Sequence, residues 1–231
     1  MKRRLVLLGL TAAVAAVATL PLALVSRSLA SSGLAADEAS GSVWNGTLRA
    51  ARLGGHPLGD LAVALPALPL LLGQQQLDVS GANWSARLSR GRRTGVLSSD
   101  GLLPSIALAP LHGATIEVSL RQARLVFEDG RCIEGAGSVA AVLRWQDVQL
   151  PELVLEGPVE CARGVGQVTL TNGDRGAFPI QLLATVPEDG SYRLQASAQP
   201  ADPLARAALV AGGFHETPSG LGRIVEGSLF E

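Results

Sequence analysis

From residue 40 onward the chain consists of short segments in which apolar and polar residues alternate. Alternation with a period of two is typical of strands that are buried on one face. Glu128-Asp129-Gly130, Asn172-Gly173 and Asp189-Gly190 follow or separate such runs and are turn or hairpin signals. The alternation predicts strands at residues 117–121, 122–127, 139–145, 153–155, 166–170, 180–186 and 192–198. The pattern predicts an all-β fold, a curved or partly closed antiparallel sheet with short helices.

Two short helices are expected beside these strands. Asp202 is a candidate N-cap with Pro203 at the first helical position, and the helix should run through Val210 and stop at Gly212-Gly213. A second helical turn is expected at Leu68–Leu72. It lies within a patch rich in leucine and proline, residues 65–72, which is too short to cross a membrane.

The N-terminus carries a third kind of segment. Residues 5–25 are twenty-one residues without a charge, and they follow Lys2-Arg3-Arg4. About 20 apolar residues span a bilayer as a helix, and a flanking basic cluster stays on the cytoplasmic side. We therefore expect residues 1–27 to form a cytoplasmic tip and a transmembrane anchor, and residues 28–231 to form an exported β-rich domain.

A cleaved signal peptide is the alternative for this segment. Ser28-Leu29-Ala30 has the small-x-small form of a cleavage site, although the apolar run is longer than the roughly 7–15 residues of an ordinary signal peptide. Both interpretations place the remaining chain outside the cytoplasm.

Charge and composition exclude some classes of protein. Beyond residue 27 the chain contains fifteen arginines and twenty acidic residues, which gives a formal net charge of −5. This negative charge argues against a nucleic-acid partner. The low aromatic content, with one tyrosine and four phenylalanines, is unlike a carbohydrate-binding lectin.

Cys132 and Cys161 are the two cysteines of the chain. In an exported compartment an even pair favours a disulfide over two free thiols. The segments 139–145 and 153–155 between them are expected to be strands, so a meander would bring the cysteines within reach of each other. A C-x-x-C spacing is missing, so we expect a structural bridge without a redox role.

No pattern of catalytic or metal-binding residues emerges. His56, His112 and His215 are far apart and lack metal-site spacing, and neither a G-x-S-x-G elbow nor a phosphate-binding loop occurs. The cluster Arg90-Gly91-Arg92-Arg93 is either a solvated loop or a contact with anionic lipid or an acidic partner. We expect a structural or binding protein, with no enzymatic activity, no cofactor and no metal.

A weak repeat occurs in the N-terminal half. The pattern S-G-x-x-W-x-x-x-L is found at residues 40–48 and again at 80–88. It predicts a recurring strand whose tryptophan packs on the same face each time. Trp44 is expected to be substantially buried near the start of the sheet.

Together these features resemble a known family. The basic start and membrane helix are followed by a Ser-Gly-x-x-Trp-x-Gly motif, here Ser40, Gly41, Trp44 and Gly46, then by the leucine-proline patch and the cysteine pair. This order is similar to the type II secretion system protein N family over nearly the whole chain. The resemblance implies an accessory, single-pass component of the inner membrane, with most of the chain in the periplasm and other type II secretion components as partners. It implies no catalytic residues.

The same features also resemble the wider group of AsmA-type β-groove proteins of the inner membrane. That resemblance implies binding or transfer of lipid along an apolar groove. The repeat and a mean hydropathy of +0.29 are compatible with it.

Overall fold

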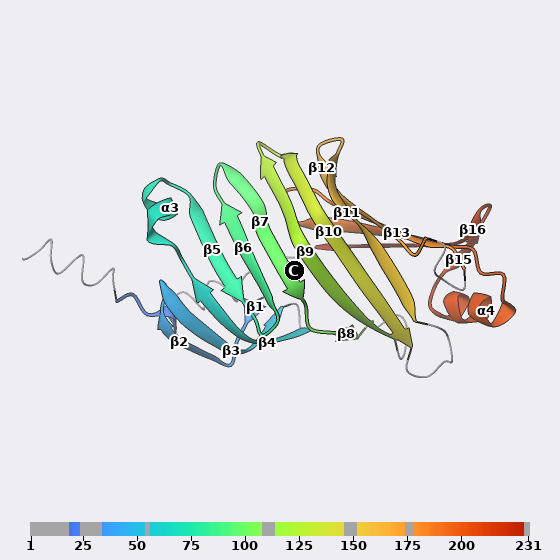
Figure 1. The fold of residues 1–231 in the computed structure, drawn as a ribbon, viewed down its shortest axis with the longest axis horizontal. Coiled ribbons are helices and arrows are strands. Elements are labelled where there is room, and N and C mark those ends of the chain that lie inside the picture. Colours follow the sequence, from blue (N-terminus) through green and yellow to red (C-terminus); the bar gives the residue numbers. More distant parts are fainter. Residues whose placement is uncertain are drawn as a thin grey trace, which may run out of the picture.

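The computed structural model describes residues 19–23, 34–53, 56–107, 114–145, 152–173 and 178–228. Within these ranges the chain forms sixteen strands and two short helices (Figure 1). The strands are β1 (Leu34–Ala35), β2 (Glu38–Ser42), β3 (Asn45–Leu53), β4 (His56–Ala64), β5 (Gln75–Ser80), β6 (Trp84–Arg90), β7 (Arg93–Leu102), β8 (Ile106–Ala107), β9 (Ala114–Glu128), β10 (Arg131–Trp145), β11 (Leu153–Ala162), β12 (Val165–Thr171), β13 (Ile180–Val186), β14 (Ser191–Ala198), β15 (His215–Thr217) and β16 (Gly220–Ser228). The helices are α3 (Ala67–Leu71) and α4 (Pro203–Ala211).

The strands form one antiparallel sheet in which neighbours along the chain are neighbours in space. The order is β1-β3-β4-β5-β6-β7-β9-β10-β11-β12-β13-β14-β16-β15, with β2 also on β3 and β8 also on β9. Among the described strands no pairing joins the first edge to the last, so the sheet is open. The predicted all-β class and the single antiparallel sheet are confirmed.

A β-bulge explains why the sequence pattern divides β9 into two runs. Apolar residues fall at even positions before Gln122, whereas Ala123, Leu125 and Phe127 fall at odd positions after it, with buried Val126 as an exception. Gln122 has a φ of +48°, and Gly137 (φ +83°) lies against its carbonyl at a register shift in β10. A bulge adds one residue to one strand and bends it. The alternation therefore changes phase, and the odd-numbered apolar residues after the bulge share a face with the even-numbered ones before it.

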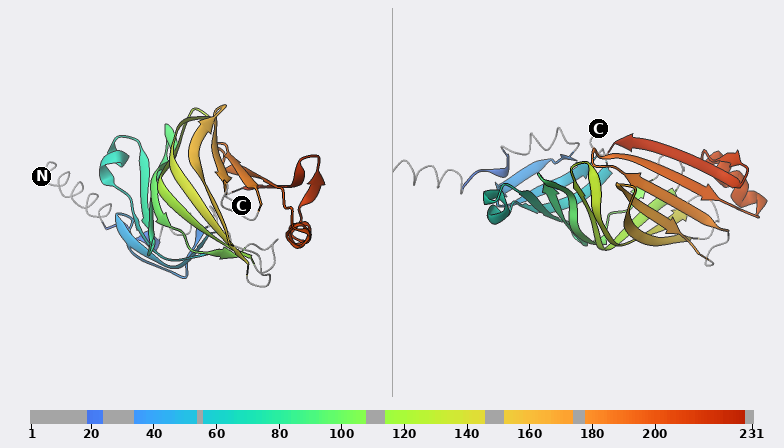
Figure 2. Two further views of the ribbon diagram at one scale, coloured as in Figure 1. Left: turned by 45° about the vertical axis from the view of Figure 1, so that its right-hand side comes forward. Right: turned by 90° about the horizontal axis from the view of Figure 1, so that it is seen from above.

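That apolar face is the concave face of a curved sheet, which Figure 2 shows from two further sides. A Cβ added at Gly166 in β12 would lie 2.6 Å from the side chain of Leu125 in β9. The order of the sheet puts β10 and β11 between these strands, so contact between them requires strong curvature toward this face.

Two apolar clusters occupy the concave side. The N-terminal cluster contains the buried residues Leu22, Val43, Leu48, Ala51, Leu61 and Val63. The C-terminal cluster contains Ala141, Leu143, Leu153, Leu155, Leu170, Phe178, Ile180, Ala198, Ala205, Leu209, Phe214 and Leu221. The first lies under β3 to β6 and the second under β10 to β16, so each half of the sheet has its own core.

Helix α4 covers part of the C-terminal cluster and forms as the sequence predicts. Asp202 caps it by accepting a hydrogen bond from the Leu204 N–H at 3.1 Å, and Pro203 is its first residue. Its inner face contributes Ala205 and Leu209 to the core.

The two hairpin signals in this half differ in outcome. Asp189-Gly190 lies in the short turn between β13 and β14. Asn172-Gly173 precedes a longer connection, and the Asn172 side chain is buried there. Its amide nitrogen donates to the Phe178 carbonyl at 2.7 Å and its oxygen accepts from the Ile180 N–H at 3.1 Å. The asparagine thus fixes the start of β13 rather than forming a two-residue turn.

Most of the predicted membrane span, residues 5–25, lies outside the described residues. Its described piece, residues 19–23, contacts the first strands, and Leu22 is buried in the N-terminal cluster. Among the described residues, no helix is long and apolar enough to cross a membrane.

Candidate functional site

The motif residues Ser40, Gly41, Trp44 and Gly46 form the hairpin between β2 and β3. Gly41 pairs with Gly46 in the antiparallel register, and Val43 and Trp44 make the turn. Gly41 has a φ of +84°, and a Cβ on it would lie 2.7 Å from the Asn45 carbonyl oxygen. The motif therefore specifies a tight hairpin that a side chain at position 41 would obstruct.

This hairpin holds the chain segment that enters the fold. The Val43 N–H donates to the Leu20 carbonyl at 3.0 Å, and the Leu65 N–H donates to the Val43 carbonyl at 3.1 Å. A Cβ on Gly46 would lie 2.6 Å from Cδ2 of Leu22. The motif thus joins residues 19–23 to the residues just before α3. The sequence pattern did not predict this role.

The tryptophans of the repeat pack against the same core. Trp44 and Trp84 are both half-buried against the N-terminal cluster, so Trp44 is less buried than we expected. Trp84 starts β6 just after the turn, where the Gly81 N–H donates to its carbonyl at 2.9 Å. The repeated unit is a hairpin turn with an inward tryptophan rather than a strand.

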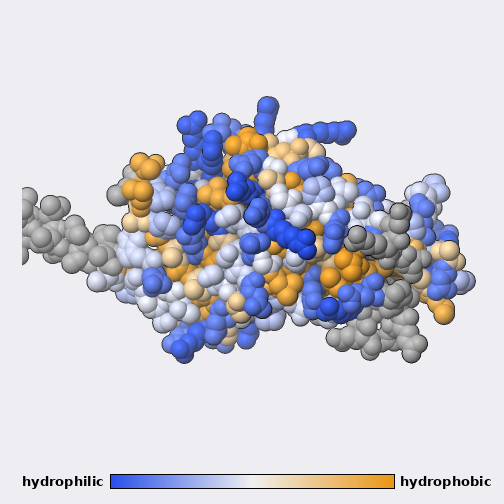
Figure 3. Space-filling model, viewed as in Figure 1, coloured by the Kyte–Doolittle hydropathy of each residue, from blue (hydrophilic) through white to orange (hydrophobic). Residues whose placement is uncertain are grey.

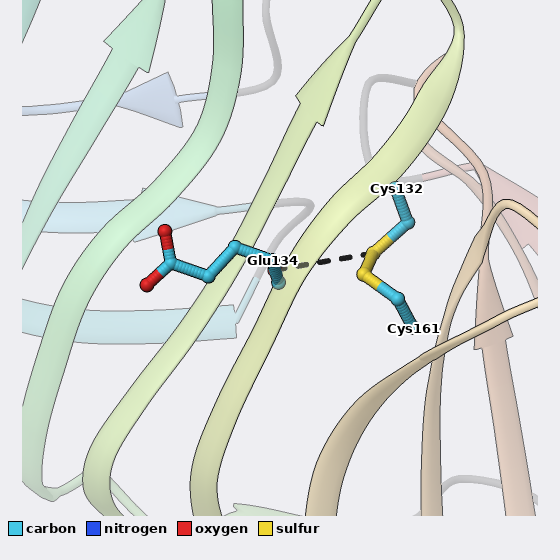
Figure 4. The surroundings of a disulfide bond; sticks show 3 residues. All are labelled: Cys132, Glu134 and Cys161. Atoms are coloured by element: carbon cyan, nitrogen blue, oxygen red, sulfur yellow. Dashed lines mark hydrogen bonds between the residues drawn. A yellow bond between two sulfur atoms is a disulfide. The ribbon is translucent and has the colours of Figure 1, made fainter.

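Cys132 and Cys161 are joined by a disulfide, as the sequence predicts (Figure 4). Cys132 lies near the start of β10 and Cys161 near the end of β11, with their Cα atoms 5.5 Å apart. The Cys132 N–H donates to the Gly164 carbonyl at 2.7 Å. The bond therefore joins β10 to β11 at one end of this pair of strands.

The convex face carries rows of cross-strand ion pairs. Arg87 bonds Asp78 at 2.6 Å, and this hydrogen bond and charge raise the pKa of Arg87. Arg144 lies between Glu152 and Glu117. Its hydrogen bond to Glu152 and the negative charges of both glutamates raise the pKa of Arg144. Figure 3 shows hydrophilic side chains across the middle of the face seen in Figure 1. Such exposed pairs contribute little stability each and mark this face as solvated.

The remaining candidate residues are dispersed. His56 starts β4 and His215 starts β15, both exposed, while His112 lies outside the described residues. Within the part of the chain that the structure describes, no three His, Cys, Asp or Glu side chains are placed to bind a metal. A groove of about 730 Å³ lies over β13, β14 and β16 beside the β15 hairpin. Its lining mixes polar side chains, among them Gln181, Gln195 and Ser197, with the apolar Leu183 and Ile224.

Comparison with known protein families gives a match over most of the chain. The family model described as type II secretion system protein N matches residues 32–224. This range includes the motif hairpin, both cysteines and nearly all of the sheet. Searches of the curated proteins and of the solved structures find no significant match.

Proposed function

Because the chain belongs to the type II secretion system protein N family, we propose that it is an accessory inner-membrane component of that system. In this role it supports assembly or function of the machine that exports folded proteins across the outer membrane. The observation that carries the proposal is the family match over residues 32–224, which makes the chain a component of the secretion system. The accessory role and the membrane attachment go beyond that match.

The motif hairpin supports the membrane attachment. Residues 5–18 continue directly from the segment that the hairpin holds, and this stretch is uncharged after a basic start. In the proposed arrangement the apolar N-terminal segment attaches the chain to the inner membrane, and the β-sheet lies in the periplasm. The hairpin then fixes the sheet close to the membrane exit, since Leu20 and Val43 share a backbone hydrogen bond.

The proposed role is non-enzymatic and depends on contacts with other type II secretion components. A solvated convex face and, among the described strands, the sheet edge formed by β15 and β16 leave broad surfaces for such contacts. The lipid-transfer interpretation receives no support from the family match, which is to protein N alone. Residues of the chain itself also pack on the concave side in both halves of the sheet.

Gene deletion tests the proposed function. Deletion in the parent bacterium should reduce secretion of folded exoproteins, and a plasmid copy should restore it. Cross-linking in membranes followed by purification of the tagged protein should recover another type II secretion component. Unchanged secretion together with no recovered component would contradict the proposal.

A further inference from the structure

Helix α3 presents leucines to solvent instead of to a core. Leu68 is 72% exposed and Leu72 is 75% exposed, while Leu70 is 39% exposed. These three side chains occupy a short segment between β4 and β5. Figure 3 shows hydrophobic side chains gathered at the position of α3. Neighbouring exposed apolar side chains of this size indicate a binding surface.

An arginine-rich hairpin lies beside these leucines. Gln75 at the start of β5 pairs with Arg90 at the end of β6, and a Cβ on Gly91 would lie 3.6 Å from the Gly73 carbonyl oxygen. Arg92 lies in the turn that follows, and Arg93 is the first residue of β7. Together, α3 with its exposed leucines and the hairpin Arg90–Arg93 form what we name the leucine–arginine tip.

The tip carries an excess of positive charge. Arg92 and Arg93 share one carboxylate, that of Glu128, at 2.8 and 3.9 Å. The Arg92 side chain is still 84% exposed. Among the described residues Arg90 makes no ion pair, and it is exposed. Three arginines therefore meet one partner carboxylate.

The tip lies where the entering chain meets the sheet. Val43 is hydrogen-bonded to Leu20 on one side and to Leu65, two residues before α3, on the other. Figures 1 and 2 agree in placing α3 and residues 19–23 at the same end of the sheet. A chain that leaves a membrane just before residue 19 would bring α3 close to the membrane surface.

We propose that the leucine–arginine tip rests on an anionic phospholipid bilayer. The leucines enter the interface between head groups and acyl chains, and the arginines bind lipid phosphates. Exposed leucines next to three arginines that share one carboxylate fit this surface, because a bilayer presents an apolar interior close beneath negatively charged head groups. The inference rests on the membrane attachment proposed above, and it adds a second contact that sets how the sheet is oriented.

Depth-sensitive labelling tests this contact in the full-length protein. A fluorescent NBD group is attached to Leu72→Cys, and the protein is reconstituted into phosphatidylcholine vesicles with or without one third phosphatidylglycerol. The Cys132–Cys161 disulfide leaves the new thiol as the reactive one. We expect a blue-shifted emission that lipid-borne nitroxides quench, and we expect both effects to be stronger in the anionic vesicles.

Matched variants separate this contact from simple attachment. A label at Asn83→Cys, in the exposed turn at the other end of β5, should stay in water. Replacing Arg90 and Arg92 by glutamine should lower the quenching at position 72 toward the Asn83 level. A label at Leu68→Cys repeats the measurement if the first variant has a lowered melting temperature.

Vesicle flotation distinguishes failure of this inference from failure of the proposed attachment. Protein that floats with the vesicles while labels at 68 and 72 remain as water-exposed as the label at 83 would overturn the tip contact alone. If the labels at 68 and 72 stay water-exposed on vesicles but become shielded when an acidic protein is added, the tip contacts a protein surface instead of the bilayer. Protein that does not float with either vesicle would contradict the attachment and the inference together.

Discussion

At the scale of single residues, the entry of the chain into the sheet depends on two glycines and a leucine. Gly41 supplies the positive φ of the motif hairpin, and Gly46 leaves room for Leu22. Both glycines could be noticed in the sequence as part of a motif. The partner of Gly46 could not, because Leu22 precedes it by twenty-four positions in a segment whose composition indicates a membrane helix.

Gly46→Ala should lower the free energy of unfolding by about 1–3 kcal/mol, because the new methyl group meets Leu22 and two backbone carbonyls. Chemical denaturation of the reconstituted or detergent-solubilised protein measures the change. Leu22→Ala removes one of the obstacles and is itself destabilising, since Leu22 is 2% exposed. In the double variant the costs should be less than additive; costs that add within about 0.5 kcal/mol would show that the two residues do not interact.

Asp189 gives a prediction about pH. Its carboxylate accepts hydrogen bonds from the Ser191 hydroxyl at 2.7 Å and the Ser191 N–H at 2.9 Å, and these lower its pKa. A group whose pKa is lower in the folded state stabilises the fold above its unfolded pKa, and the contribution is lost as pH falls through the folded value. The turn should therefore weaken only in acid, below the ordinary pKa of an aspartate.

NMR titration of the Asp189 carboxyl carbon checks this expectation. Ser191→Ala removes the hydroxyl, which is the larger cause of the shift, and should raise the pKa of Asp189 toward its ordinary value. An identical titration curve in the variant would show that the hydroxyl does not bond the carboxylate in solution.

At the scale of the elements, bulges and the disulfide shape the sheet. Gln122 and Gly137 bend β9 and β10 near their middles, and the disulfide fixes the β10–β11 pair at one end. If apolar and polar residues are assumed to alternate without interruption, β9 is divided into two predicted strands at Gln122. The same difficulty applies to β3, where Ala50 has a φ of +48° and the register shifts. Strands without such interruptions, β13 and β14 above all, were predictable almost to the residue.

Removing the disulfide should destabilise the fold without changing it. The bond closes a loop with a sequence separation of 29, for which the chain-entropy model gives about 3–4 kcal/mol. Urea denaturation of the Cys132→Ala, Cys161→Ala double variant should show this loss, with an unchanged far-UV circular dichroism spectrum. Reduction of the wild type by dithiothreitol is the matched control and should give a similar midpoint.

Thiol labelling tests the bond in the cell. Protein taken from the exporting compartment should react with no thiol reagent before reduction. Two reactive thiols there would contradict both the bridge and the expectation of export.

At the scale of the whole molecule, the sequence predicted the class of fold and the family, but not how the halves are joined. Alternation indicates strands one at a time, and it gives no information about contacts such as that between Gly166 and Leu125 across the curved sheet. The tip was visible as two separate features, a leucine-proline patch and an arginine cluster. Only the pairing of Gln75 with Arg90 brings them together, because strand register depends on the complete sheet.

The junction between β4 and β5 leads to the last prediction. These strands share three residue pairs, Ala62–Ser80, Val63–Val79 and Ala64–Asp78, fewer than most neighbours in the sheet. The N-terminal cluster spans this junction, since Leu61 and Val63 in β4 pack with Leu77, Val79 and Trp84. We expect the cluster to make up for the short pairing, so that the first strands unfold together with the rest.

Two probes measure whether unfolding is cooperative. Two of the three tryptophans, Trp44 and Trp84, pack on the N-terminal cluster, so tryptophan emission in a Trp145→Phe background reports on that cluster, whereas far-UV circular dichroism reports on the whole sheet. The two denaturation curves should coincide in the wild type, the test of a two-state transition. Val79→Ala removes apolar contacts at the junction and should move the tryptophan curve to lower denaturant, while Val159→Ala, a buried residue of β11, should shift both curves together. Separate curves in the wild type would mean that the N-terminal cluster unfolds as an independent unit and does not couple the first strands to the rest of the sheet.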